Sequence, residues 1–301
     1  MSIPQYIINS NLLPSYTPVC RENMLRKFIP ASTILAASSL FIHKTTQCDS
    51  STPTQPTLNE TYRKSLLPYL QREHEFTVQW IKDEEGWTKL PARAWPAYQP
   101  DIEEISTIEH SLSTQCPKQD DTKWNNECST IKFNLATALV FNNHGKAIDE
   151  MHHTNGFNMY TELATQKDHA DSKCAVGVIL VEGLGTDANE LEGLIYLRDA
   201  ANNDRHPQAL YELGTAYYAG IEDVLNENEH LAFINFAAAS ELGHYAGMFM
   251  TADCLMEGIG TEIDVERAVP LLFTAAISGH RYARQKVREL YKKYGDGVVE
   301  E

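Results

Sequence analysis

Basic residues are scarce in this chain. Its 301 residues include 25 lysines and arginines against 41 aspartates and glutamates, so the formal net charge is −16 at pH 7. Nucleic-acid affinity depends mainly on Lys and Arg side chains that neutralise phosphates, so this balance argues against nucleic acid as a partner. The first 48 residues depart from it, with four basic residues and one acidic residue: Arg21, Arg26, Lys27, Lys44 and Glu22.

An apolar run long enough to cross a bilayer is also missing. Residues 28–42 form an apolar run, but as a helix it would measure only about 22 Å, against a hydrocarbon core of roughly 30 Å. A cationic stretch followed by a modest apolar run is typical of targeting sequences. Residues 1–48 are therefore predicted to be a disordered targeting region, and residues 28–42 would associate with a membrane only if they are not cleaved.

The destination of this region has two alternatives. Read from Met1, its composition is typical of a mitochondrial presequence with a sorting segment, which favours the intermembrane space or the inner membrane. Translation from Met24 would instead place Met-Leu-Arg-Lys before the apolar run, as in a secretory signal that leads to the ER lumen. A glycan on the sequon Asn59-Glu-Thr61 would mark the secretory route.

Signatures of catalysis are absent as well. The sequence contains no phosphate-binding loop, Gly-x-Ser-x-Gly elbow, zinc-protease motif or kinase motif. The glycine pairs Gly183-x-Gly185 and Gly258-x-Gly260 follow predicted helices and no strand, so they are not a dinucleotide-binding fingerprint. We therefore expect no enzymatic activity and no cofactor.

Metal ligands at the spacing of a tetrahedral site are not found either. His144, His152 and His153 are close in sequence, but no cysteine or paired carboxylate accompanies them, so no metal site is predicted. Among the six cysteines, Cys116 and Cys128 are close enough for a local disulfide bond in an oxidising compartment. The others are Cys20, Cys48, Cys174 and Cys254, of which the last two lie in predicted helices as buried thiols.

The sequence does contain a repeat of 36–38 residues. The segment 169–183 aligns without a gap with 206–220 and again with 244–258, and its first half matches 280–291. A fixed period in this range is typical of solenoids, in which each repeat packs on its neighbours. Each copy begins with a histidine, which we expect to lie at a helix start: His169, His206, His244 and His280.

Each repeat predicts two helices. If the histidine is position 1, small or apolar residues at positions 4, 8, 9 and 12 share one face of the first helix, as Ala209, Leu213, Gly214 and Tyr217 do. A glycine inside a helix costs roughly 1 kcal/mol relative to alanine. Its recurrence at position 9 therefore indicates close packing of two helices. The glycine at position 15 is expected to end the first helix.

The second helices have start signals of their own. Asn226 and Glu229 have the spacing of a capping box, and Asp264 is expected to cap the helix of the next copy. Pro270 lies past the first turn of that helix, where proline removes a backbone hydrogen bond. We therefore expect a kink or a late helix start at Pro270.

Four short motifs resemble the Sel-one-like repeat, a relative of the tetratricopeptide repeat. They are Leu-Gly-x-x-Tyr-x-x-Gly at 213–220, Gly-x-Gly-Thr at 183–186 and 258–261, and Ala-Ala-x-x-Gly-His at 275–280. The resemblance covers somewhat under half of the chain. It implies an all-α, right-handed superhelical solenoid of stacked antiparallel helix pairs, whose concave groove binds proteins. Ile221-Glu222 replaces the expected x-Gly after Gly220, so we expect a different turn there.

The array is predicted to run from 128 to 294. Its units are 128–168, 169–205, 206–243 and 244–279, followed by a half unit at 280–294. The first unit is degenerate, with a long turn at 142–155 and a second helix at 157–165.

Three other regions are predicted outside the array. Residues 49–58 are polar and proline-containing, which is typical of a linker. Residues 59–127 should contain helices, one of them with Ile102, Ile105, Ile108 and Leu112 on one face, and an extended Pro/aromatic stretch at 86–100. That stretch either caps the solenoid or binds a partner. Residues 295–301 form an acidic tail.

The predicted function follows from the first helices. Positions 7, 10 and 14 lie away from the core face and provide candidate protein-binding residues, or a merely solvated surface. Most of these side chains are acidic, which favours a basic or amphipathic segment as the partner. The candidates are Asn134, Glu182, Glu212, Met250, Asp253, Glu257 and Lys286.

We interpret the chain as a non-catalytic, mitochondrial scaffold, adaptor or assembly factor that binds proteins through this groove. The alternatives are a permanent structural subunit of a larger mitochondrial complex and an adaptor of the secretory pathway.

Overall fold

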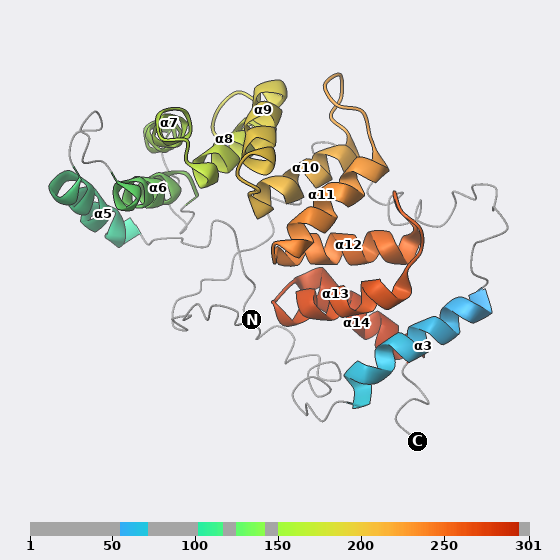
Figure 1. The fold of residues 1–301 in the computed structure, drawn as a ribbon. Coiled ribbons are helices and arrows are strands. Elements are labelled where there is room, and N and C mark those ends of the chain that lie inside the picture. The colour runs from blue at the N-terminus through green and yellow to red at the C-terminus, as the bar shows by residue number, and fades with distance from the viewer. Residues whose placement is uncertain (1–54, 72–101, 117–124, 142–149, 295–301) are drawn as a thin grey trace. The chain divides into compact units, whose positions relative to one another are not determined.

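The structure, a computed structural model, describes residues 55–71, 102–116, 125–141 and 150–294. Within these ranges the chain forms helices, and the only strand-like pairing there is one isolated bridge (Figure 1). The helices are α3 (Gln55–Gln71), α5 (Ile102–Gln115), α6 (Asn126–Phe141), α7 (Glu150–Gln166), α8 (Ala170–Glu182), α9 (Glu190–Asn202), α10 (Pro207–Ala219), α11 (Glu229–Glu241), α12 (Tyr245–Glu257), α13 (Val265–Ile277) and α14 (Arg281–Tyr294).

Several predicted segments lie outside the described residues. They are the targeting region 1–48 with its apolar run 28–42, the Pro/aromatic stretch 86–100 and the tail 295–301. The linker prediction at 49–58 needs correction at its end, because α3 already begins at Gln55. A helix with apolar residues on one face was predicted after Asp101, and α5 confirms it.

The helices pack in the order of the repeats. Each first helix contacts the second helix of its own repeat, in the pairs α6–α7, α8–α9, α10–α11 and α12–α13. Neighbouring repeats are joined by contacts of α7 with α8, α9 with α10, α11 with α12 and α13 with α14. The predicted all-α solenoid of helix pairs is therefore confirmed.

Each repeat histidine caps a first helix. The Nδ1 atom accepts a hydrogen bond from the backbone N–H three residues later, at 3.3 Å for His169, 3.2 Å for His206, 3.0 Å for His244 and 3.2 Å for His280. An N-cap side chain usually supplies an oxygen for one of the unpaired N–H groups of the first turn. The imidazole ring does the same here, which confirms the predicted helix-start role.

Two of these rings also bond to the preceding repeat. Because Nδ1 accepts, the ring proton lies on Nε2, which is then a donor. His206 Nε2 lies 2.9 Å from Oδ1 of Asp171, and His244 Nε2 lies 2.7 Å from Oε1 of Gln208. Asp171 and Gln208 both occupy position 3 of their repeats. One neutral histidine ring thus connects two consecutive first helices while it caps one of them.

The glycines at position 9 explain the close approach within a repeat. A Cβ atom at Gly214 would lie 2.5 Å from Cδ1 of Phe236 on α11, and one at Gly177 would lie 2.7 Å from Cγ of Leu197 on α9. Contacts this short do not occur between real side chains, so these positions have no room for a methyl group. The predicted packing role of the glycines is confirmed.

The turn of the second copy differs, as predicted. Gly183 and Gly258 end α8 and α12 in the left-handed conformation, with φ of 63° and 75°. Gly220 has a similar φ of 67° but a ψ of 171°, and the chain continues into an isolated antiparallel bridge between Ile221 and Leu225.

That bridge also moves the next helix start. The N-cap of α11 is Asn228, whose Oδ1 atom accepts from the N–H of Leu231 at 2.9 Å, so the capping box predicted at Asn226 is wrong. The backbone N–H of Asn228 in turn donates to the carbonyl oxygen of Tyr217 at 2.7 Å. The chain must complete the hairpin-like turn before it can return to α10 and begin a helix.

Two further helix starts differ from expectation. Asp264 caps α13 as predicted, and the helix begins at once with Val265. Of the two alternatives at Pro270, the late start is therefore wrong, because the proline lies inside the helix, and the kink stays a prediction. The second helix of the first unit begins at Glu150 and not at residue 157. Its first turns carry exposed residues such as Met151 and His152, so no apolar periodicity indicated them.

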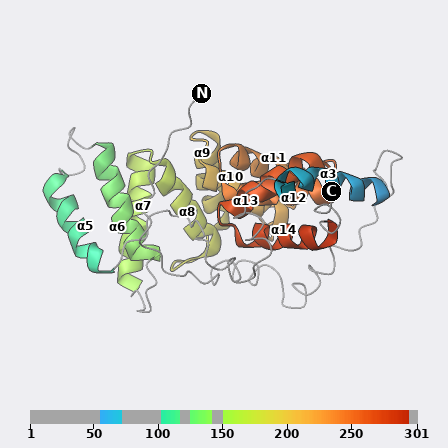
Figure 2. The ribbon, with the colours of Figure 1, turned by 90° about the horizontal axis from the view of Figure 1, so that it is seen from below.

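Helices from the early part of the chain lie at both ends of the array. α5 packs on α6, and the disulfide bond Cys116–Cys128 suggested by the sequence is present, with a Cα–Cα distance of 5.6 Å. α3 packs on α13 and α14 (Figure 2). The last helices of the array are therefore covered by a helix that is far away in sequence.

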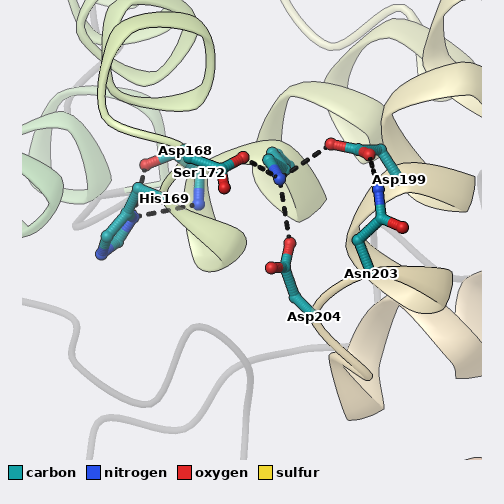
Figure 3. A network of polar contacts seen from close by, with 7 residues as sticks. Asp168, His169, Ser172, Asp199, Asn203 and Asp204 are labelled. Atoms are coloured by element: carbon teal, nitrogen blue, oxygen red, sulfur yellow. Dashed lines mark hydrogen bonds and ion pairs between the residues drawn. The ribbon is translucent and has the colours of Figure 1, made fainter.

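A buried lysine, Lys173, links the two helices of the repeat at residues 169–205 (Figure 3). Lys173 is only 3% exposed, and its Nζ atom pairs with Asp168, with Asp199 at 2.8 Å and with Asp204 at 3.0 Å. Burial by itself would lower the pKa of Lys173, but the hydrogen bonds to the three carboxylates outweigh it and raise the pKa. The same contact lowers the pKa of Asp199. Lys173 thus joins the start of α8 to the end of α9.

The contact at Gly214 can be tested by Gly214→Ala. We expect the free energy of unfolding to fall by about 1 kcal/mol or more, because overpacking costs roughly 1–3 kcal/mol and outweighs the better helix propensity of alanine. Urea unfolding followed by circular dichroism measures the change. Phe236→Leu removes ring atoms that the new methyl group would meet. The double variant should therefore lose less stability than the two single losses added, whereas additive losses would contradict a direct clash.

The charge network can be tested by Lys173→Met. We expect a loss of about 3 kcal/mol or more, because the change removes the cation between Asp199 and Asp204 while both carboxylates stay in place. Asp168→Asn is the matched control, since this partner is 84% exposed in its side chain and an exposed pair contributes only about 0–1 kcal/mol. Chemical denaturation at pH 7 compares the two. Equal losses of unfolding free energy in the two variants would show that the buried ion pairs of Lys173 contribute no more to stability than the exposed pair with Asp168.

Candidate functional site

The seven candidate residues lie on first helices of consecutive repeats. We call this surface the first-helix face, defined by Asn134 on α6, Glu182 on α8, Glu212 on α10, Met250, Asp253 and Glu257 on α12, and Lys286 on α14. Glu257 is exposed and the other six side chains are half-buried. They therefore lie at the boundary between the packed helices and solvent, where a partner could reach them.

Three of the candidates form one ion-pair cluster. Lys286 Nζ lies 3.2 Å from Oδ1 of Asp253 and 3.2 Å from Oε1 of Glu257. Burial raises the pKa of Asp253, and Lys286 opposes that shift. Burial would lower the pKa of Lys286, but the two carboxylates outweigh it and raise the pKa. The cluster thus joins α12 to α14 and neutralises much of its own charge.

Two tyrosines that the sequence did not single out flank this cluster. Burial, followed by the negative charge of Glu257, raises the pKa of Tyr62 on α3 to about 12. Burial, followed by the charge of Asp253, raises the pKa of Tyr218 on α10 to about 12. Tyr218 occupies position 13 of its repeat, a position that the repeat pattern did not assign to the face. No local pattern could have placed Tyr62 here, because α3 is far away in sequence.

Acidic side chains of α8 and α10 lie near the buried Cys174. Burial raises the pKa of the Cys174 thiol, and the charges of Glu212 and Asp171 raise it further. Gln208 connects this region to the histidine contacts, because its amide nitrogen donates to Glu212 while its amide oxygen accepts from His244. Glu212 is therefore held in place by the same residue that links α10 to α12.

Met250 belongs to an aromatic patch between α10 and α12. The patch surrounds the buried residues Phe236 and Cys254, and its members are half-buried side chains that a partner could cover. They are Tyr211, Tyr217, Tyr218, Phe233, Met250 and Ile259. Tyr217 also accepts a hydrogen bond from Nη2 of Arg198 at 3.4 Å. Met250 thus joins the first-helix face to a patch that continues onto Phe233 of α11 and Ile259 after α12.

The perturbed ionisable groups act in packing. Lys173 is held in its charged form, whereas a lysine that acts as a base or nucleophile needs a lowered pKa. Burial raises the pKa of Cys174 and raises that of Cys254 to about 12, which disfavours the reactive thiolate. None of these three groups therefore has the lowered pKa that a nucleophile or a base needs.

Neither a cluster of metal ligands nor a membrane-spanning helix occurs in the described residues. There, no three side chains of His, Cys, Asp or Glu lie close enough together to hold a metal ion. His152 is exposed and His153 half-buried, while His144 lies outside the described ranges. Of the helices that the structure describes, none is long and apolar enough to span a bilayer.

The family comparison matches the repeats. The model of the Sel1 repeat matches residues 170–204, 207–244 and 246–280. These segments begin one or two residues after a capping histidine, so they coincide with the helix pairs α8–α9, α10–α11 and α12–α13. Repeats of this family are typical of protein-binding adaptors.

Two solved structures are similar to the chain. A Sel1 repeat protein from Oxalobacter formigenes is 25% identical, with 43% of this chain and 95% of that chain covered and a TM-score of 0.39. A protective antigen of uropathogenic Escherichia coli strains that displays an SLR fold is 17% identical, with 83% of this chain and 54% of that chain covered and a TM-score of 0.48. At these TM-scores, the assignment depends on the family model and on the helix packing. The protein contains three consecutive Sel1 repeats, and they form the central part of an all-α solenoid.

Proposed function

We propose that the protein is a non-catalytic scaffold, adaptor or assembly factor that binds another protein along the first-helix face. The observation that carries this proposal is the set of mainly acidic, mostly half-buried residues at positions 7, 10 and 14 of the first helices of consecutive repeats. Repeat proteins offer such surfaces because every repeat presents the same positions to the same side. Glu182 and Glu212 represent the face on α8 and α10, the two neighbouring first helices that carry acidic candidates outside the ion-pair cluster of Lys286.

The partner is a basic or amphipathic segment. The acidic positions on α8 and α10 favour Lys and Arg and steer their approach. The half-buried aromatic patch around Met250 lies on α10, α11 and α12 and offers apolar contact area beside these charges. Aromatic and methionine side chains are common at such contact sites. A segment with a basic and an apolar face would use both.

The proposed compartment is the mitochondrial intermembrane space or inner membrane. The Cys116–Cys128 disulfide bond supports an oxidising compartment, a property shared by the alternative, the ER lumen. The secretory alternative would expose the sequon at Asn59 to glycosylation. Asn59 lies on α3, is half-buried, and has a buried Oδ1 atom, so a glycan would disturb the packing of this helix. This favours the mitochondrial assignment.

A second candidate function is that of a permanent subunit of a larger complex. It is favoured by large apolar side chains that are exposed on the second helices, because permanent interfaces are more apolar than transient ones. Leu191 is 61% exposed and Ile195 is 59% exposed on α9, and Ile234 is 46% exposed on α11. Ile195 and Ile234 occupy equivalent positions, so they lie on the same side of neighbouring repeats.

The binding surface is tested by the double variant Glu182→Lys and Glu212→Lys. We expect it to lose at least tenfold in affinity for partners captured by the wild-type chain, because like charges would then meet the basic segment. The matched control is Glu241→Lys with Glu266→Lys, two exposed residues on second helices that change the net charge equally. Tagged chains are compared by quantitative mass spectrometry of captured proteins. Equal loss in both variants would exclude the first-helix face as the specific site.

Permanent association predicts a different result. A structural subunit should co-migrate with one assembly at high salt, and Ile195→Asp with Ile234→Asp should release it while the glutamate variants do not. Native electrophoresis of detergent extracts separates these outcomes. Release at moderate salt by the glutamate variants alone would favour the adaptor and contradict the subunit.

The compartment is tested on the mature protein. We expect it in the mitochondrial fraction, with an N-terminus after residue 42, no glycan on Asn59, and Cys116 and Cys128 protected from alkylation until a reductant is added. Intact-mass measurement of the protein purified from this fraction, with alkylation before and after reduction, reports the N-terminus, the glycan and the disulfide bond. A glycan on Asn59, or a signal peptide removed from a chain that starts at Met24, would place the protein in the secretory pathway.

A further inference from the structure

The most distinctive packing in the described chain lies at the end of the array. α3 contacts α13 and α14, although the residues between them in sequence include the three Sel1 repeats (Figures 1 and 2). Along α3, the side chains of Leu58, Tyr62, Leu66 and Tyr69 pack against the apolar cluster of the last repeat. Their spacing of four, four and three residues places them on one face of the helix.

This contact has the features of a specific helix-docking site. Leu66 is completely buried, the ring of Tyr69 stacks on Phe273 with centroids 4.2 Å apart, and the ring of Tyr62 stacks on Tyr294 with centroids 4.9 Å apart. Aromatic pairs at these distances add geometric preference to the burial of apolar area. We call the surface of α13 and α14 that contains Phe273 and Tyr294 the terminal face.

A polar cluster borders the terminal face. Burial and the charges of Glu257 and Asp253 raise the pKa of the Tyr62 hydroxyl group, and the charge of Lys286 opposes them. Tyr62 therefore lies beside the ion-pair cluster that joins α12 to α14. The hydroxyl group is both a donor and an acceptor. The terminal face therefore favours a helix that carries a tyrosine at this position and apolar or aromatic side chains at the other three.

α3 also has features that make it a replaceable occupant. The Oδ1 atom of Asn59 is buried against the array without a hydrogen-bond partner, which is unfavourable for docking. Pro68 lies inside the helix, where it removes one backbone hydrogen bond. A single helix of this length is marginal by itself in water and depends on the surface against which it packs. These defects weaken α3 while the terminal face stays formed by α13 and α14.

We propose that the terminal face is a second binding site, which α3 occupies in the free protein and which accepts in its place a partner helix. The partner helix carries an apolar residue, a tyrosine, an apolar residue and an aromatic residue at the spacing of Leu58, Tyr62, Leu66 and Tyr69. This site is separate from Glu182 and Glu212 and does not depend on the proposed function of the first-helix face. Binding there exchanges one helix for another and leaves the repeats intact.

The exchange is tested with a fluorescent peptide of residues 55–71 and the full-length chain. In the wild type, α3 is tethered, so its high effective concentration should keep the peptide out. Leu66→Glu in the full-length chain places a charge in the buried centre of the contact and should free the terminal face. We expect the variant to bind the peptide at least tenfold more tightly than the wild type does, measured by fluorescence anisotropy. A peptide that itself carries Leu66→Glu is the matched control and should bind neither chain.

Two results would overturn the proposal. One is equal binding of the peptide to both chains, or binding to neither. The other is loss of the helical signal and of the cooperative melting transition in the Leu66→Glu chain, because α3 would then be an indispensable part of the array. Hydrogen exchange of the wild type provides an independent measurement. Amides of α3 should exchange at least tenfold faster than those of α13, and equal protection of the two helices would contradict replacement.

Discussion

The fold depends on the close approach of the two helices in each repeat. At Gly177 and Gly214 the first helix has no side chain, and the space is filled by Leu197 and Phe236 of the second helix. Phe236 is completely buried as a result. Apolar surface buried at this contact stabilises the helix pair and gives the next pair a defined surface on which to stack. The repeat is thus specified by steric fit more than by helix propensity, which glycine weakens.

Polar contacts between consecutive repeats depend on a few residues that each make two contacts. His206 and His244 each cap a helix with one ring nitrogen and bond to the preceding repeat with the other. In this acidic chain, some lysines lie where carboxylate side chains are close together. Lys173 and Lys286 do so, within one repeat and between two repeats respectively. Glu182 and Glu212 on α8 and α10 are the acidic positions on which the proposed binding of a basic partner depends.

The sequence located the array and the starts of its first helices but misplaced several other elements. The capping histidines and the small residues at position 9 recur with the period, so one copy supports the assignment of the next. The start of α11 was misplaced because the turn before it contains the bridge between Ile221 and Leu225, so the N-cap residue that bonds back to the first helix comes later in the chain than in the neighbouring repeats. The early start of α7 was missed because its first turns are exposed and carry no apolar period. Compartment and partner stay predictions.

By itself, the sequence determined the repeat, its helix pairs, the capping histidines and the Cys116–Cys128 pair, because each depends on residues within about one repeat length of each other. The tertiary structure alone decided that Lys286 neutralises Asp253 and Glu257, and that α3 covers α13 and α14. The repeat pattern placed Asp253, Glu257 and Lys286 on one face but did not decide which side chains pair, and nothing in the sequence of α3 indicated its contact with α13 and α14. Only the packed array brings their side chains together, and local spacing could not have indicated it.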